Sequence, residues 1–130
     1  VFSKKNLFKK LPKELQKTQY HGDFTLENMI FKKQFFLLDC SEGIFDSYIF
    51  DYSKLRQDID ALWFLRNTQN TNDTIFLKLN FMKKKLSNQL KYYNNKYLLI
   101  LMLLRVYKYT KEKSFEKNFL LEKINKIWMS

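Results

Sequence analysis

The sequence predicts an α+β fold that is mainly α-helical, in which one β-hairpin packs on a bundle of helices. Only two glycines and one proline occur in 130 residues, which favours long helices with few breaks. The 45% hydrophobic and 18% aromatic content is ample for the core of a single domain over residues 1–130. Two short apolar runs on either side of a polar tripeptide, between positions 28 and 39, predict the hairpin.

The N-terminal segment, residues 6–19, has apolar side chains at near-helical spacing with lysines between them. Pro12 lies inside this pattern. Proline is tolerated in the first turn of a helix and disrupts a helix interior. We therefore expect either one amphipathic helix interrupted at Pro12 or a short helix that starts there.

The hairpin is expected from strands at residues 28–31 and 35–39, joined by a tight polar turn at 32–34. A helix should follow over residues 48–66, and a polar turn-forming stretch at 66–73 should end it. Its expected buried face consists of Leu55, Ile59, Leu62, Trp63 and Phe64. The next helix, over residues 74–93, carries its apolar stripe at Ile75, Phe76, Leu79, Met82, Leu86 and Leu90.

Two more helices are expected near the C-terminus, at 97–109 and 114–129, the second with Ser114 as its N-cap. Residues 97–104 form an apolar run of eight that stops at Arg105. A membrane-spanning helix needs about twenty such residues, so we expect a core helix and no membrane span.

The net charge of +11 is unevenly distributed. Eight of the thirteen acidic residues fall within residues 21–60, and both flanking regions are strongly basic. The basic flanks favour an anionic ligand such as a nucleotide, although a solvated lysine-rich surface accounts for most of them. With no signal peptide and a single cysteine, the chain is expected to be cytoplasmic, and Cys40 to be a small buried hydrophobic residue.

The segment His21-Gly22-Asp23-Phe24-Thr25-Leu26-Glu27-Asn28 sets an aspartate and an asparagine five positions apart in one short loop. Phosphoryl transfer requires an acceptor hydroxyl, a metal ion and a terminal phosphate to be held close together. The segment matches the H-R-D-x-x-x-x-N catalytic loop of protein kinases, with Gly22 in place of arginine. It resembles the aminoglycoside phosphotransferase and choline kinase family, the small-molecule branch of the kinase-like fold.

This resemblance implies that Asp23 is the catalytic base and that Asn28 and Asp39 hold Mg²⁺. Asp39 ends the second strand, so the hairpin would return it beside Asn28. Cys40 and Ser41 depart from the family pattern, which has Phe-Gly or an aromatic and an acidic residue here. Glu42 is a candidate for the carboxylate that is missing at this point.

His21 and Gly22 are expected to support the loop, His21 as a structural pin and Gly22 by a backbone conformation or close approach. Residues 45–55 resemble the next landmark of the family, the start of a long helix. Asp51 is its matching acid, and we expect it to support the loop or cap the helix.

The resemblance further implies ATP or GTP as phosphate donor and a small-molecule hydroxyl as acceptor, in a sugar, an amino alcohol or an aminoglycoside. Among relatives, phosphotransferases of bacterial surface-sugar synthesis look closest. The substrate-binding residues are unassigned. Aromatic residues Tyr48, Tyr52, Trp63 and Phe64 form either a cage for a quaternary ammonium or part of the core. Three acids either bind an amine or form a solvated helix face: Asp46, Asp58 and Asp60.

The family also implies an N-terminal nucleotide-binding lobe, and no glycine-rich loop or lysine-bearing strand precedes the motif. We therefore expect this chain to be the C-terminal catalytic lobe of such an enzyme, with the other lobe in cis. Two alternatives are a catalytically degenerate kinase-like scaffold and a basic helical domain that binds nucleic acid. The lysine runs are not interleaved with exposed aromatic residues on any one predicted element, which disfavours nucleic acid.

Overall fold

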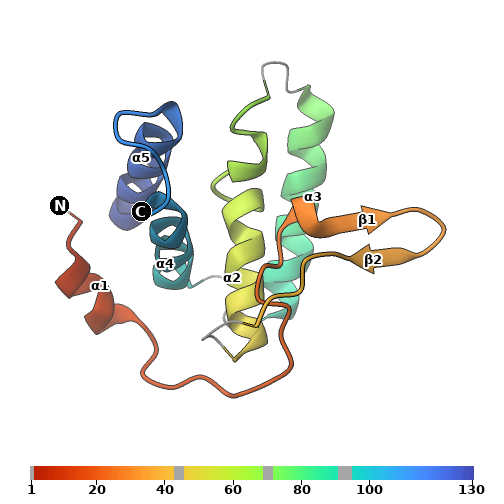
Figure 1. Ribbon diagram of the computed structural model, residues 1–130, viewed down its shortest axis with the longest axis horizontal. Helices are drawn as coiled ribbons and strands as arrows, with labels where there is room; N and C mark the ends of the chain where they lie inside the picture. Colours follow the sequence, from red (N-terminus) through yellow and green to blue (C-terminus); the bar gives the residue numbers. More distant parts are fainter. Residues whose placement is uncertain (1, 43–45, 69–71, 91–94) are drawn as a thin grey trace.

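The computed structural model describes residues 2–42, 46–68, 72–90 and 95–130. A β-hairpin of β1 (Met29–Phe31) and β2 (Phe35–Leu37) projects beside the helices α2 (Tyr48–Ile59) and α3 (Asp73–Gln89) (Figure 1). On the other side of α2 lie α4 (Lys96–Tyr107) and α5 (Phe115–Met129), which pack on each other. The expected mainly helical α+β class, with one antiparallel hairpin, is confirmed.

The expected hairpin is confirmed, and the structure supplies its register. Met29 pairs with Leu37 and Phe31 with Phe35. The turn closes where the backbone N–H of Lys32 donates to the carbonyl oxygen of Gln34 at 3.1 Å. A 3₁₀ turn at Leu26–Asn28 leads into β1 and joins the motif loop directly to the first strand.

The N-terminal helix begins earlier and is shorter than expected. Helix α1 covers Lys4–Lys10, and Leu11 after it is extended. A residue before proline is pushed out of helical conformation, so the helix ends before Pro12. Residues 12–20 contain no helix, so the expectation of helical structure after Pro12 was wrong.

Helix α2 starts where the sequence indicated, with the Ser47 side chain accepting a hydrogen bond from the backbone N–H of Ile49. It ends at Ile59, seven residues before the expected end. Leu62 adopts a left-handed conformation with φ of +62°, which no α-helix accommodates, and a 3₁₀ turn follows at Trp63–Leu65. Because of this break Phe64 is exposed, and its assignment to the buried face was wrong.

The remaining helices lie close to their expected ranges. Helix α3 is capped by Asn72, and α5 by Ser114, whose hydroxyl accepts from the backbone N–H of Lys117. The expected end of α3 at Tyr93 lies outside the described residues. Leu79 is the buried residue of α3, and Phe76, which was expected in its apolar stripe, is exposed. Helix α3 therefore packs on the rest of the molecule along a narrow apolar stripe.

The apolar side chains form two clusters. The larger joins α1, the 3₁₀ turn, α4 and α5 through Leu7, Ala61, Trp63, Leu99, Ile100, Leu103, Leu120 and Ile124. The smaller lies between α2, α3 and the start of the hairpin, and its buried members are Leu55, Ile59, Leu65 and Leu79. Phe24, Leu26 and Met29 pack against this second cluster, which fixes the motif loop to α2.

The apolar run at 97–104 forms part of α4 and contributes core residues, as its length predicted. Within the described ranges, no helix has both the length and the apolar character that crossing a membrane requires.

Candidate functional site

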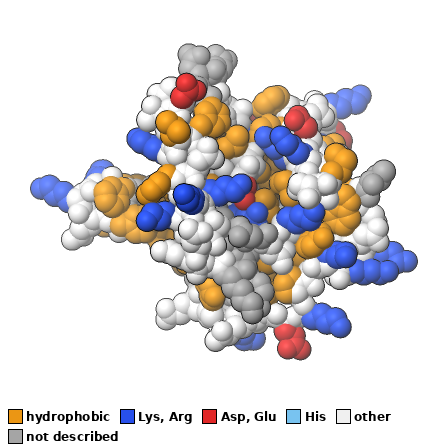
Figure 2. Space-filling view, turned by 180° about the vertical axis from the view of Figure 1, so that it is seen from behind, with side chains coloured by type: hydrophobic (Ala, Val, Ile, Leu, Met, Phe, Trp, Pro, Cys, Tyr) orange, Lys and Arg blue, Asp and Glu red, His pale blue; other side chains and the backbone are white. Residues whose placement is uncertain are grey.

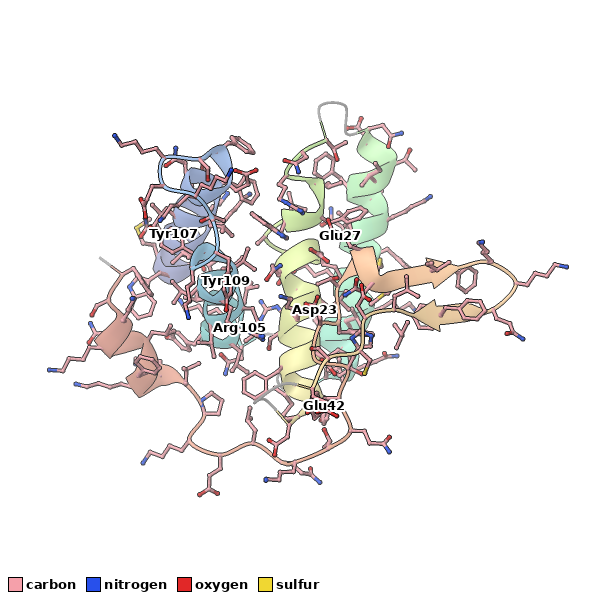
Figure 3. All side chains as sticks on the ribbon, in the orientation of Figure 1. Asp23, Glu27, Glu42, Arg105, Tyr107 and Tyr109 are labelled. Carbon is pink, nitrogen blue, oxygen red and sulfur yellow. The ribbon has the colours of Figure 1, made fainter. Side chains whose placement is uncertain are left out.

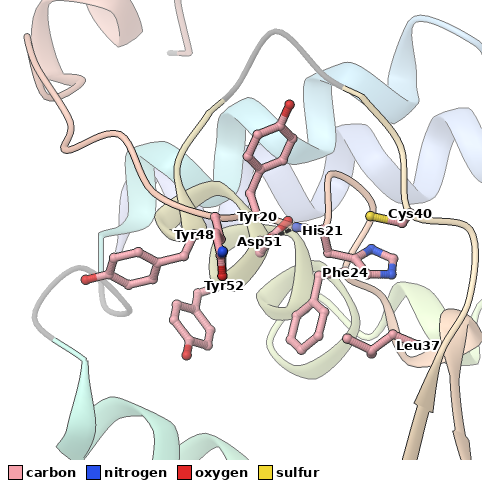
Figure 4. Close-up of a pocket in the computed structure, with 9 residues that line it drawn as sticks. Tyr20, His21, Phe24, Leu37, Cys40, Tyr48, Asp51 and Tyr52 are labelled. Carbon is pink, nitrogen blue, oxygen red and sulfur yellow. Dashed lines mark hydrogen bonds between the residues drawn. The ribbon is translucent and has the colours of Figure 1, made fainter.

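Asp51, on the first turns of α2, binds the backbone of the motif loop. Its carboxylate oxygens accept hydrogen bonds from the N–H groups of His21 at 2.6 Å and Gly22 at 2.9 Å (Figure 4). Hydrogen bonds to a charged acceptor are about twice as strong as neutral ones. A single buried carboxylate therefore holds two consecutive peptide groups immediately before Asp23. The helix cap is Ser47 rather than Asp51.

Asp58 provides a second attachment from two turns further along α2. Its carboxylate accepts a hydrogen bond from the backbone N–H of Leu26 at 2.8 Å. Burial raises the pKa of Asp58 to about 6, and the hydrogen bond from Leu26 opposes this rise. The loop is thus bound to α2 both before and after Asp23.

Gly22 has a backbone that no other residue would adopt without strain. Its φ is +87°, and a Cβ built on it would lie 2.2 Å from the carbonyl oxygen and 2.5 Å from the hydroxyl of Ser41. The backbone N–H of Ser41 donates to the carbonyl oxygen of His21 at 2.9 Å. The segment that follows the hairpin therefore crosses directly over the motif loop, and the missing side chain allows this approach.

His21 is buried beneath the loop. Its Nδ1 accepts a long hydrogen bond of 3.4 Å from the backbone N–H of Asp23, and its ring contacts Phe24 edge-on. Its Nε2 is buried and has no hydrogen-bond partner among the residues that the structure describes. These contacts support a structural role for His21 in shaping the turn.

Asp23 has two side-chain neighbours. The Nδ2 of Asn28 donates to the carbonyl oxygen of Asp23 at 2.8 Å and to its Oδ2 at 3.1 Å. The Nζ of Lys54, on α2, lies 3.1 Å from Oδ1 of Asp23. Figure 3 shows Asp23 next to α2 at the base of the hairpin. The amide nitrogen of Asn28 is thus engaged by Asp23.

Asp39 is exposed and follows β2 with φ of +53°. The backbone N–H of Leu38 donates to the carbonyl oxygen of Asn28 at 2.9 Å, so Leu38 lies opposite Asn28. Asp39 is the next residue along the chain. A neutral amide oxygen and a carboxylate are ligands that suit Mg²⁺, which keeps several waters and phosphate oxygens of its own. The chemistry of these two side chains therefore suits this ion, and their joint binding of it stays a prediction.

Glu42 does not complete a larger carboxylate site. Among the residues that the structure describes, no three His, Cys, Asp or Glu side chains gather as they would around a metal ion. Asp23, Asp39 and Glu42 are all among them. Asn28 and Asp39 remain the pair that could hold a metal.

A pocket of about 430 Å³ lies beside the loop (Figure 4). Its wall is mostly apolar and aromatic, formed by Gln19, Tyr20, His21, Phe24, Leu37, Cys40, Tyr48, Asp51 and Tyr52. Cys40 is exposed and lines this pocket, so its expected burial was wrong.

The four aromatic residues considered as a cage do not lie together. Tyr48 and Tyr52 contact each other edge-on in this pocket, with ring centroids 5.5 Å apart. Trp63 belongs to the larger core cluster and Phe64 is exposed on the 3₁₀ turn. The four residues therefore do not form one cage, and Trp63 packs the core.

The three acids considered for amine binding are also separate. Asp46 pairs at the surface with Lys17, and this contact lowers the pKa of Asp46. Asp58 is buried against the motif loop, and Asp60 pairs with Arg56 at 2.7 Å. Asp58 is buried and the Asp60 side chain is only 8% exposed, so the expectation of a solvated helix face was wrong for these two acids, and amine binding stays a prediction.

Lys54 was not predicted as a site residue, and Asp58 was predicted with a different role. Together with Asp51 they occupy positions 51, 54 and 58, a spacing of three and four that places all three on one face of α2. A charged stripe at this spacing on the helix after the motif was a usable signal. Nothing in the sequence identified the motif loop as the partner of this charged face.

Comparisons with known proteins found no match: no family model, no curated protein and no solved structure resembles this chain closely enough to assign a family.

Proposed function

We propose that this chain carries the acceptor-activating and metal-binding half of a small-molecule phosphotransferase of the kinase-like type. The observation that supports this most strongly is the geometry of Asp23 and Asn28. The Asn28 amide nitrogen is fixed on Asp23, while its oxygen and the Asp39 carboxylate remain as ligands for a hard cation. This division of roles matches the requirements of phosphoryl transfer.

In the proposed reaction, Asp23 accepts the proton of an acceptor hydroxyl. The hydroxyl oxygen forms a bond to the terminal phosphorus of the nucleoside triphosphate, and the bond from that phosphorus to the bridging oxygen breaks, releasing the diphosphate. Mg²⁺, when bound by Asn28 and Asp39, supplies positive charge beside the phosphate oxygens. Asp51 and Asp58 keep the loop in position throughout, because their hydrogen bonds go to its backbone.

Asp23 also has a partly exposed carboxylate, as a base that must reach a bound substrate requires. The neighbouring ammonium of Lys54 holds one of its oxygens. This arrangement supports a base whose orientation is set before the acceptor binds. The acceptor itself remains a proposal at the level of class, an alcohol of a sugar, an amino alcohol or an aminoglycoside.

The test is Mg²⁺-dependent consumption of ATP and GTP by the full-length protein, with sugars, amino sugars, choline and aminoglycosides as acceptors. Asp23→Asn should lower turnover by about a hundredfold or more while leaving nucleotide affinity almost unchanged. Asp73→Asn, at the exposed start of α3, is the matched control and should keep parental turnover.

Turnover with one acceptor class that is lost in Asp23→Asn would support the phosphotransferase and identify its substrate class. Equal turnover in the parent and Asp23→Asn would overturn the assignment of the base. Absence of both turnover and nucleotide binding would favour a catalytically degenerate scaffold.

A further inference from the structure

The β-hairpin exposes apolar side chains on both of its faces. Phe31 and Phe35 face each other across the strands on one side, and Ile30 and Phe36 do so on the other. All four are exposed, Phe31 with 83% of its surface accessible. An ordinary hairpin packs one face on the core and turns a polar face to water. This hairpin has no polar face along its strands.

The tip of the hairpin is basic. Lys32 and Lys33 form its turn, and no Asp or Glu occurs from residue 28 to residue 38. In Figure 1 the hairpin projects away from the helices, and the view from behind shows apolar side chains along the projecting arm and Lys or Arg side chains at its end (Figure 2). The arm therefore combines exposed aromatic side chains with lysines, so the expectation that the lysine runs lie apart from exposed aromatic residues was wrong for the hairpin.

The apolar surface continues onto α3. Phe81 lines one groove with Met29, at the start of β1, and a second groove with Leu77. Leu77 and Phe81 are both exposed, Leu77 to 68%. The Nζ of Lys85 lies 5.5 Å from the centre of the Phe81 ring. The two grooves share Phe81 and Met82, and the first of them reaches the start of the hairpin at Met29.

The charge of this surface is predominantly positive, with Asp73 at the exposed start of α3 as an acidic exception. Residues 74–90 of the chain contain no Asp or Glu, as is true of residues 28–38. The lysines in these two segments are Lys32, Lys33, Lys78, Lys83, Lys84 and Lys85. Lys83 lies 3.5 Å from Asp60, so part of its charge is balanced from α2. For the other five lysines, no Asp or Glu occurs within residues 28–38 or 74–90.

We propose that this basic apolar surface, made of the β-hairpin and the outer side of α3, binds the surface of an anionic lipid bilayer. A flat protein partner would cover one face of the hairpin and leave the aromatic residues of the other face in water. The interfacial layer of a bilayer surrounds an inserted tip on both faces. Lysine ammonium groups next to inserted aromatic rings then reach the anionic headgroups.

The composition of the surface favours lipid over nucleic acid. Bases stack on aromatic rings, and aliphatic side chains such as Ile30, Leu37 and Leu77 offer them no comparable contact. The cations within residues 28–38 and 74–90 are all lysines, whereas arginine is the residue suited to bidentate contacts with phosphates and bases. Acyl chains accept aromatic and aliphatic side chains alike. The proposal does not depend on phosphotransfer.

The test is sedimentation of the full-length protein with vesicles of phosphatidylcholine alone and of phosphatidylcholine with an equal part of phosphatidylglycerol. We expect binding to the anionic vesicles that weakens as salt is added, and far weaker binding to the neutral ones. The double variant Phe31→Ser, Phe35→Ser should lower the affinity by at least about tenfold. Lys32→Gln and Lys33→Gln should each lower it by about fivefold.

Phe115→Ser is the matched control, because Phe115 is similarly exposed, to 62%, at the start of α5 and outside the proposed surface. It should bind vesicles as the parent does. Circular dichroism checks that the hairpin variants keep the parental helix content.

Three results would overturn the proposal. One is a parent that fails to bind anionic vesicles at low salt. Another is a Phe31→Ser, Phe35→Ser variant that binds them as tightly as the parent. The third is a parent that self-associates, or binds single-stranded oligonucleotides, through these same phenylalanines while ignoring vesicles.

Discussion

The Nζ of Lys54 lies 3.1 Å from the Oδ1 of Asp23, and this contact links the middle of α2 to the centre of the motif loop. The Lys54 side chain is only 12% exposed, whereas that of Asp23 is 42% exposed. The ammonium is therefore held by its surroundings, and the carboxylate keeps access to solvent. Such a pair sets the direction of the carboxylate more than it stabilises the fold.

Lys54→Met should lower kcat of the proposed phosphotransfer by about tenfold to a hundredfold, because Asp23 loses the contact that orients it. Stability should change by less than about 1 kcal/mol, since water can solvate the exposed side of Asp23. Lys54→Arg should restore part of the turnover. Steady-state kinetics and urea unfolding of the three proteins check this, and a loss of stability without a loss of kcat would contradict it.

Gly22→Ala should destabilise the protein by about 2 kcal/mol or more, because a Cβ there meets Ser41 and a positive φ is strained for alanine. Adding Ser41→Gly removes the hydroxyl contact but leaves the backbone carbonyl oxygen 2.2 Å from the new Cβ. The double variant should therefore remain destabilised. Urea unfolding of the single and double variants measures this, and full recovery in the double variant would show that the backbone can move aside.

The buried carboxyl of Asp58 should make stability depend on pH. Its pKa is about 6 in the folded protein, above the ordinary value of 3.8, so the folded state binds this proton more tightly than the unfolded state. The free energy of unfolding should then fall as pH rises from about 4 to about 6, by about 3 kcal/mol from this group, and level off above.

Asp58→Asn should remove this part of the pH dependence, because an amide does not titrate and its oxygen can still accept from Leu26. The measurement is urea unfolding of parent and variant across this pH range. Asp73→Asn, exposed on α3, should keep the parental slope. Identical slopes for the parent and Asp58→Asn would refute the assignment.

Asp39→Asn should weaken binding of the metal–nucleotide complex by at least about tenfold, since a carboxylate ligand is replaced by a neutral one. Asp23→Asn should leave that binding nearly unchanged. Mn²⁺ titration in the presence of nucleotide, followed by electron paramagnetic resonance, separates the two. If the two variants bound Mn²⁺ equally well, Asp39 would not be a metal ligand. In a separate measurement, a metal chelator should abolish any turnover of the parent.

Local patterns predicted the elements whose limits are set locally. The hairpin follows from two apolar runs around a polar tripeptide, and α5 from a serine cap and an apolar stripe. The end of α2 did not follow, because residues 60–66 continue a helical apolar pattern. The left-handed backbone of Leu62 turns Trp63 into the core with α4 and α5, and that packing overrides the local preference.

The exposure of individual side chains was the least predictable property. Phe64 and Cys40 were expected inside and are exposed, while Asp58 was expected at the surface or on an amine and is buried. Each outcome depends on which segment lies over the residue, and these segments are distant in the chain.

The sequence by itself determined the class of fold, the hairpin, and the five-residue spacing of Asp23 and Asn28 in one loop. Only the tertiary structure decided what holds that loop, because Asp51, Lys54 and Asp58 reach it across about thirty intervening residues. Helical periodicity places these three side chains on one face of α2, but it does not state what that face meets. Packing of Phe24, Leu26 and Met29 on the second apolar cluster brings the motif loop onto this face of α2. The three charged side chains then bind the loop on both sides of Asp23 and at Asp23 itself.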